Sequence, residues 1–231
     1  MNSFPRLEAL HGGVVVSCQA GPDSPLNHPT MIAALAASAA RGGAAGFRVD
    51  GANNIAAVRA VSDLPIIGIN KEPHAGSDVF ITPTYSSARV IAAAGSDLLA
   101  IDGTARPRPG GERFRDILAA SHDEFGLPVM ADIATVEEGL DALELGADVV
   151  ATTLAGYTAY STDKTQPAFD VLAEITRQGG RVIVEGRLWT VEEVSRAFEL
   201  GAFAVVIGSA ITVPEFITRR FVAAAPAAQP A

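Results

Sequence analysis

Short apolar runs rich in β-branched residues recur along the chain, and each is followed by a longer stretch rich in Ala, Leu and Glu. The runs have the length of buried strands, and the longer stretches have the composition of helices. Regular alternation of this kind is typical of βα units that share a parallel sheet. The expected strands are at residues 13–19, 45–50, 66–71, 98–102, 129–133, 149–153, 182–185 and 204–207.

The polar positions between the runs carry signals that begin and end helices. Thr135 and Thr190 each precede a glutamate by three residues, which is the spacing of a capping box. Glycine follows the last helical turn in segments 40–44, 144–147 and 199–202, where it favours a left-handed cap. Eight such units in 231 residues predict an α/β fold, a single (β/α)8 TIM barrel. The alternative is a doubly wound open sheet, but the first strand lacks the Gly-x-Gly-x-x-Gly turn of that fold.

Composition narrows the class of protein. The chain is 48% hydrophobic and can build a large core, which fits one large domain about as well as two small ones. The unbroken repetition of βα units favours one barrel domain over residues 1–222. Residues 223–231 form an Ala/Pro-rich tail that gives little to bury, so we expect it to be frayed. The net charge is -9, and the 17 Lys and Arg do not form the basic face that nucleic acid requires. A small anionic ligand is still compatible with this charge.

The single cysteine, Cys18, excludes an intramolecular disulfide framework and fits a reducing cytoplasm. No apolar stretch approaches the ~20 residues that cross a bilayer, and the N-terminus lacks the pattern of a signal peptide. The four histidines are scattered without ligand spacing, so we expect no metal site. A cytoplasmic protein with neither nucleic-acid nor membrane partners is therefore expected.

Candidate chemistry lies where the expected strands end, because active sites of parallel α/β barrels form at that edge. Lys71 emerges directly from an apolar run, so partial desolvation is expected to lower the pKa of its ammonium group. A neutral lysine can abstract a proton next to a carbonyl or form a Schiff base, and the residue type does not choose between them. The non-catalytic alternative is a side chain that extends into water.

The seventh run ends in Glu185, followed by Gly186 and Arg187. Glu185 is the candidate acid of the site. In many barrels the loops after strands seven and eight bind phosphate through backbone N–H groups, and glycine lets the backbone approach closely. Gly186, Gly208 and Ser209 are therefore the predicted phosphate cradle.

Polar side chains at three other strand ends are candidates for substrate binding. Gln19 could hold a substrate hydroxyl or amide, or satisfy backbone groups of its own loop. Arg48 lies in an apolar strand and requires an anion to neutralise it, either a ligand or an acid such as Asp102 or Asp132. Asp132 itself is open to both a direct and a supporting role.

Two loops add further polar groups. Thr153 and Tyr157 belong to a hydroxyl-rich turn of the kind that orients sugars. Arg106 and Arg108 follow the fourth strand in a stiff Pro- and Gly-containing loop. They could close over an anion or remain solvated, and the sequence leaves both roles open.

Taken together and in this order, the motifs resemble the N-acetylmannosamine-6-phosphate 2-epimerase family over nearly the whole chain. The matching blocks are residues 15–19, the strand around Arg48, and residues 65–71, 81–83, 102–106, 130–132, 156–158, 185–187 and 208–212.

The resemblance implies a barrel enzyme that interconverts N-acetylmannosamine 6-phosphate and N-acetylglucosamine 6-phosphate in amino-sugar or sialic acid breakdown. It implies no metal or redox cofactor and a homodimer, for which the apolar segment 216–225 offers surface. Lys71 would abstract the C2 proton, which lies next to the C1 aldehyde of the open-chain sugar, and return on the other face would invert C2. Glu185 would assist proton movement at the sugar oxygens.

The same resemblance implies that Gln19, Arg48 and Asp132 hold the N-acetyl group and hydroxyls or fix the catalytic side chains. Gly186, Gly208 and Ser209 would hold the phosphate.

The chain departs from the family pattern at Val213, where an arginine is common. Arg187, or the pair Arg219 and Arg220, could supply the missing cation. Asn70 also stands where an apolar residue is usual. Two alternatives remain. A Schiff-base aldolase or lyase that acts on a phosphosugar would use the same lysine, and a non-catalytic phosphosugar-binding protein is suggested by the change at Val213.

Overall fold

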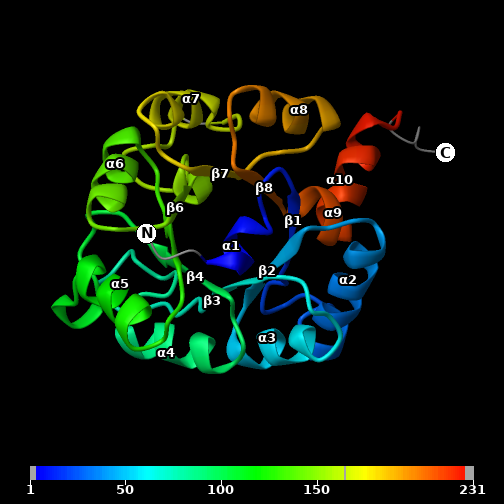
Figure 1. Cartoon of the computed structure of the whole chain (residues 1–231). Helices are drawn as coiled ribbons and strands as arrows, with labels where there is room; N and C mark the ends of the chain where they lie inside the picture. Colours follow the sequence, from blue (N-terminus) through cyan, green and yellow to red (C-terminus); the bar gives the residue numbers. More distant parts are fainter. Residues whose placement is uncertain (1–3, 164, 227–231) are drawn as a thin grey trace.

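The computed structural model describes residues 4–163 and 165–226. Eight parallel strands pair in chain order and close into a barrel (Figure 1). This confirms the predicted (β/α)8 TIM barrel over the open sheet. The strands are β1 (Val14–Cys18), β2 (Gly46–Asp50), β3 (Ile66–Ile69), β4 (Leu98–Asp102), β5 (Val129–Asp132), β6 (Val149–Ala151), β7 (Val182–Glu185) and β8 (Ala204–Ile207).

Helices surround the barrel, and α9 and α10 take the last place in the ring (Figure 1). The outer helices are α2 (Pro29–Arg41), α3 (Ala52–Arg59), α4 (Tyr85–Ala93), α5 (Phe114–Asp123), α6 (Val136–Glu144), α7 (Phe169–Arg177), α8 (Val191–Glu199), α9 (Ser209–Thr212) and α10 (Pro214–Ala224). Two 3-10 turns, η1 (Pro109–Gly111) and η2 (Thr152–Leu154), follow β4 and β6.

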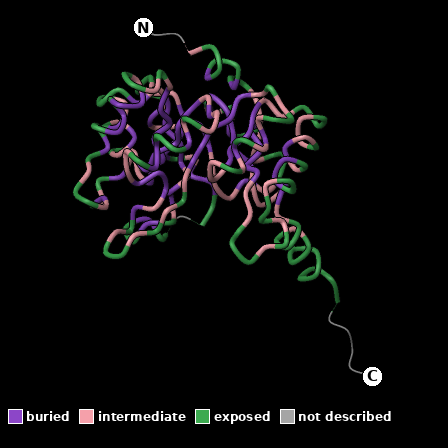
Figure 2. The backbone as a smooth tube through the Cα atoms, turned by 90° about the horizontal axis from the view of Figure 1, so that it is seen from below, coloured by how far each residue is buried: buried purple, intermediate pink, exposed green. Residues whose placement is uncertain are grey.

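A short helix that the sequence pattern did not predict, α1 (Pro5–Glu8), covers the end of the barrel where the strands begin. Figure 1 shows it in the middle of the ring of helices. Leu7 and Leu10 are 1% and 0% exposed and join the apolar cluster inside the barrel. Because this end is closed by packed apolar side chains, the polar residues gather at the opposite end. The buried core between the strands and the helices is visible in Figure 2.

The expected helix boundaries are confirmed. Thr135 and Thr190 both form complete capping boxes. Gly43, Gly146 and Gly201 have φ of 89°, 108° and 90° after the helices, a conformation that side chains with a Cβ rarely adopt. Each glycine lets the chain turn back into the next strand.

Four strands end earlier than expected, β1 and β5 by one residue and β3 and β6 by two. β3 stops at Ile69, and the backbone N–H of Lys71 donates to Asp50 Oδ1 at 2.9 Å instead of continuing the strand ladder. β6 stops at Ala151, and Thr153 lies in η2. A side-chain acceptor replaces sheet pairing after β3, and a tight turn replaces it after β6. Apolar periodicity predicts neither feature.

The Ala/Pro-rich tail begins inside α10, which extends to Ala224. The remainder of the predicted frayed tail, residues 227–231, lies outside the described residues. Among the helices that the structure describes, none is long and apolar enough to cross a membrane.

Candidate active site

Arg48, Asp132 and Glu185 meet at the open end of the barrel, although they come from β2, β5 and β7. The Arg48 guanidinium forms ion pairs with both carboxylates. Its Nη1 donates to Asp132 Oδ1 at 3.0 Å, and its Nη2 donates to Asp132 Oδ2. Arg48 and Asp132 are 1% and 0% exposed at the side chain, whereas Glu185 is 15% exposed. Glu185 is thus the member of the group that a substrate can reach.

The buried arginine keeps its charge because of these two acids. Burial opposes the charged form, but the charges and hydrogen bonds of Asp132 and Glu185 outweigh it and raise the pKa of Arg48. Of the two acids considered from sequence, Asp132 is the partner. Asp102 accepts instead from Thr104 and forms an ion pair with Arg106 at 2.7 Å.

Two hydroxyls of η2 hold Glu185. The Thr152 hydroxyl lies 3.0 Å from Glu185 O and 3.1 Å from Glu185 N. The Thr153 hydroxyl lies 3.1 Å from Glu185 Oε2 and 2.6 Å from Asp132 Oδ1. Thr152 thereby fixes the backbone of the acid, and Thr153 fixes its carboxylate.

The surroundings of Glu185 raise the pKa of its carboxyl group above the ordinary value. Burial is the main cause and raises the pKa of the carboxyl group, and the nearby charge of Asp132 adds to it. Arg48, the Thr153 hydrogen bond and Lys71 act in the opposite direction without cancelling the shift. A carboxyl group with a raised pKa can give and accept a proton closer to neutral pH.

Lys71 follows the end of β3 and is an exposed residue, with its backbone N–H on Asp50 Oδ1. Desolvation by the surrounding protein lowers the pKa of its ammonium group, as expected from sequence. Asp50 opposes this shift most strongly, and Glu185 and Asp132 oppose it further. Asp50 was not among the residues predicted for the site. Its position at the end of β2, two residues after Arg48, was the available signal.

Asn70 ties the end of β3 to α4 and so supports Lys71. Its side-chain Nδ2 donates to Ser87 Oγ at 2.8 Å, and its backbone carbonyl accepts from Thr82 N at 2.8 Å. Thr82 is fully buried with a φ of 45°, and its hydroxyl donates to Ala100 O. This polar contact gives a structural reason for the asparagine that the sequence alone did not explain.

Gln19 follows β1 at the same end of the barrel. Its Nε2 donates to Ser17 Oγ at 2.8 Å. Its Oε1 is buried without a hydrogen-bond partner among the described residues. A buried acceptor left unpaired is costly, so this oxygen is suited to accept from an N–H or O–H group of a ligand.

The predicted phosphate cradle consists of backbone that approaches closely. Gly186 has a φ of 105°. A Cβ at Gly208 would lie 3.2 Å from the Cβ of Ser17, so the β8 end packs tightly on β1. Ser209 begins α9, and the Thr212 hydroxyl closes the turn by donating to Ser17 O at 2.6 Å.

Arg187 connects two loops at the mouth of the barrel. Its Nη1 donates to Ala155 O at 2.6 Å and its Nη2 donates to Gly156 O at 3.3 Å. Its guanidinium carbon lies 4.3 Å from the centre of the Tyr157 ring. Tyr157 is 61% exposed. Arg187 and Tyr157, two of the residues predicted for substrate binding, therefore lie against each other, and backbone carbonyls hold Arg187 in place.

The two arginines after β4 are engaged within the protein. Arg106 pairs with Asp102, and Arg108 is 7% exposed, with its guanidinium on the carbonyls of Asp102 and Pro83. These contacts fix the loop instead of leaving either cation solvated. Within residues 4–163 and 165–226, no group of three or more His, Cys, Asp or Glu could hold a metal ion.

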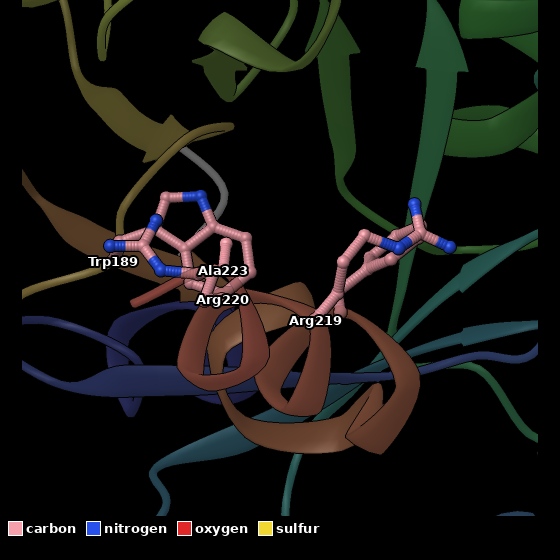
Figure 3. A pocket seen from close by; sticks show the side chains of 5 residues that line it. Trp189, Arg219, Arg220 and Ala223 are labelled. Atoms are coloured by element: carbon pink, nitrogen blue, oxygen red, sulfur yellow. The ribbon is translucent and has the colours of Figure 1, made fainter. Parts of the chain in front are cut away.

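The arginine pair of α10 lies at a separate pocket of about 300 Å³ (Figure 3). Arg220 stacks on Trp189 at 4.3 Å from the ring centre, whereas Arg219 pairs with Glu215 and lies over Phe216. Trp189 belongs to the loop after Gly186, so α10 does fold back toward the β7 end.

Comparisons with known proteins agree on one family. The model of the family described as "Putative N-acetylmannosamine-6-phosphate epimerase" matches residues 32–227. A protein from Synechococcus elongatus with the corresponding 2-epimerase description is 44% identical over 97% of this chain and 98% of its own length.

The solved structure of the N-acetylmannosamine-6-phosphate 2-epimerase from Clostridium perfringens is similar with a TM-score of 0.92 and 41% identity, and it covers 95% of this chain and 96% of that one. A thiamine phosphate pyrophosphorylase from Pyrococcus furiosus, at 13% identity and a TM-score of 0.59 over 92% of both chains, shares the fold alone. The family resemblance of the sequence blocks is confirmed.

Proposed function

Because the chain belongs to the N-acetylmannosamine-6-phosphate epimerase family, we propose that it interconverts N-acetylmannosamine 6-phosphate and N-acetylglucosamine 6-phosphate. The observation that carries this proposal is the pairing, at one barrel mouth, of a lysine with a lowered pKa and a glutamate with a raised pKa. Such a pair suits a reaction in which a proton leaves carbon and returns to it.

In the proposed mechanism Lys71 is the base. The C2 hydrogen of the open-chain sugar is acidified by the neighbouring C1 aldehyde, and the neutral amine of Lys71 removes it to form an enolate. Return of a proton to the opposite face inverts C2. Glu185, held by Arg48 and Thr153, assists by moving protons at the sugar oxygens as charge develops on them.

Substrate binding is assigned to the remaining groups of the mouth. The unpaired Gln19 Oε1 accepts from the N-acetyl N–H or a hydroxyl. Arg48 and Asp132 are nearly inaccessible, which favours the interpretation that they fix Glu185 over direct contact with the sugar. Thr153 and Tyr157 line the sugar side of the same loop.

Backbone N–H groups around Gly186, Gly208 and Ser209 bind the 6-phosphate. No arginine follows Thr212, and Arg187 or the pair Arg219 and Arg220 could supply the compensating charge. We assign the reaction to amino-sugar or sialic acid breakdown. A cytoplasmic location is consistent with the free, buried Cys18.

We also propose a homodimer formed through α10. None of the residues of this helix is buried within the chain. Phe216, Phe221 and Val222 are 40%, 75% and 65% exposed. A helix that exposes large apolar side chains is stabilised when a second copy covers them.

The test is incubation of N-acetylmannosamine 6-phosphate with the protein in deuterated water, followed by analysis of C2 in the recovered sugars. We expect deuterium at C2 and both epimers. Lys71→Ala is expected to reduce the exchange rate by about 10² to 10⁴-fold and Glu185→Gln by a smaller factor. Arg177→Ala, at an exposed pair with Glu174, is the matched control and retains activity.

Wild-type protein that leaves C2 untouched at millimolar substrate would exclude the epimerase. In that case binding without turnover would favour a phosphosugar-binding protein. Trapping of the sugar on Lys71 by borohydride would favour an aldolase or lyase, because only a Schiff base can be reduced to a stable amine.

A further inference from the structure

The Thr153 hydroxyl lies within hydrogen-bond distance of three charged side chains. Its Oγ1 is 2.6 Å from Asp132 Oδ1, 3.1 Å from Glu185 Oε2 and 3.1 Å from Arg48 Nη1. A hydroxyl has one proton to donate. Because Arg48 can only donate, the proton of Thr153 goes to one of the two carboxylates at a time.

Arg48 likewise has fewer hydrogens to donate than acceptors within reach. Arg48 Nη1 carries two hydrogens but faces three acceptors, which are Asp132 Oδ1, Thr153 Oγ1 and Glu185 Oε2. Nη2, on the other hand, is directed at Asp132 Oδ2. Any one arrangement of the hydrogens therefore leaves one of the three acceptors without a hydrogen from Arg48 Nη1. Rotation of the Thr153 hydroxyl is enough to change which acceptor that is.

The backbone around this hydroxyl is held in place. Leu154 N donates to Ile133 O at 3.1 Å, and Ala155 N donates to Thr152 O at 3.1 Å. The Thr152 hydroxyl joins the turn to the backbone of Glu185. The hydroxyl can thus change partner without movement of the chain.

We propose that Thr153 is a positioning residue whose hydroxyl donates to Asp132 while Glu185 is protonated and to Glu185 once that residue has lost its proton. The proposal rests on the proposed function, in which Glu185 changes protonation state during turnover. In the first state the Glu185 O–H donates to Thr153 Oγ1. In the second, Asp132 remains held through both oxygens by Arg48. No covalent bond to Thr153 forms or breaks.

Thr153 differs from the other groups that face Glu185. Arg48 from β2, Asp132 from β5 and Lys71 beyond β3 act on it through charge. Thr153 is the uncharged neighbour whose hydrogen bond lowers the pKa of Glu185. Loss of the hydroxyl should therefore change the titration of the acid, which a merely structural role would leave unaltered.

The test compares Thr153→Val, which removes the hydroxyl at similar volume, with Thr153→Ser, which retains it. The Glu185 side-chain carboxyl is followed by ¹³C NMR during a pH titration, with Glu185→Gln used to assign its signal. We expect the valine variant to titrate at higher pH, by up to about one pH unit, because the hydrogen bond lost from the carboxylate is stronger than the one lost from the protonated acid. The serine variant is expected within a few tenths of wild type.

Kinetics give the second readout. In Thr153→Val, the limb of the kcat–pH profile that Glu185 controls should shift to higher pH by the same amount as the NMR titration. In Thr153→Ser, it should lie close to the wild-type position. In a Glu185→Gln background Thr153→Val should have no further effect on the pH profile. If the valine variant does not fold, Thr153→Ala removes the same hydroxyl with less bulk.

An unchanged titration of Glu185 in a folded variant without the hydroxyl would overturn the proposal. The NMR titration needs no substrate, so its outcome is independent of the epimerase activity. Failure of the proposed function would be seen separately, as the absence of C2 exchange in wild type.

Discussion

Arg48 shows how one residue organises the site at the scale of single side chains. A guanidinium that is 1% exposed would be costly to bury alone, yet Asp132 and Glu185 neutralise it and are in turn fixed by it. From the sequence it was clear that Arg48 needed an anion. The choice of Asp132 over Asp102 required the structure, because both acids end neighbouring strands.

Replacement of this arginine tests the network. Arg48→Met leaves two acids without their cation, and we expect a loss of about 3–5 kcal/mol in the free energy of unfolding, measured by urea denaturation. Arg177→Met breaks an exposed pair and should cost less than about 1 kcal/mol. Equal losses in the two variants would contradict the role given to Arg48.

Asp50 offers a test of the lysine base. In the proposed mechanism epimerisation needs neutral Lys71, so the rate should rise with pH through the pKa of its ammonium group. Asp50 holds that pKa up against desolvation. Asp50→Asn removes the charge but keeps an acceptor for the Lys71 N–H, and we therefore expect the rising limb of kcat/KM to move to lower pH. A shift to higher pH, or none, would argue against Lys71 as the titrating base.

At the scale of elements, the signals for helices were local and the signals for strand ends were not. The capping boxes at Thr135 and Thr190 form as the sequence spacing predicts, because their bonds join residues three apart. The predicted ends of β3 and β6 were wrong because Asp50 and Thr152 make contacts with other segments of the chain. Local patterns cannot contain those contacts.

A cap variant checks the first statement. Thr190→Ala removes the side-chain acceptor of the Glu193 N–H at 3.2 Å, and we expect a loss of about 1 kcal/mol in thermal or urea unfolding. Thr190→Ser should recover most of it. An unchanged stability in the alanine variant would mean that the cap contributes nothing to α8.

Close packing beside β3 gives a second prediction at this scale. A Cβ at Gly68 would lie 2.0 Å from Ser96 Oγ and 2.9 Å from its Cβ. Gly68→Ala is expected to destabilise by about 1–3 kcal/mol and to displace the strand that carries Lys71. Gly21→Ala, where nothing lies within 4 Å, is the control and should leave both stability and activity near wild type.

At the scale of the whole molecule, closure of the barrel creates the site and leaves one helix uncovered. The helix α1 fills the end where the strands begin, and the functional groups therefore share the other end (Figure 1). The exposed apolar side chains of α10 remain outside this core. They are the part of the fold that a second copy would complete.

The homodimer can be tested directly. Phe221→Glu places a charge where apolar surface is expected to be buried between copies, and we expect light scattering to report half of the wild-type mass. Val61→Glu, at a residue 51% exposed after α3, is the control and should not change the mass. A wild-type monomer would contradict the proposal outright.

The number and order of the βα units follow from the sequence, which also predicts the end of the barrel at which the candidate side chains lie. Periodicity and capping are local, and the family blocks identified Lys71 and Glu185 as the central pair. Which side chains contact one another became clear from the three-dimensional fold. The partners of Arg48 depend on barrel closure, whereas the contact of Asp50 with Lys71 and that of Thr153 with Asp132 depend on the pairing of neighbouring strands. Closure brings strands together that are 84 or more residues apart, beyond the reach of any local pattern.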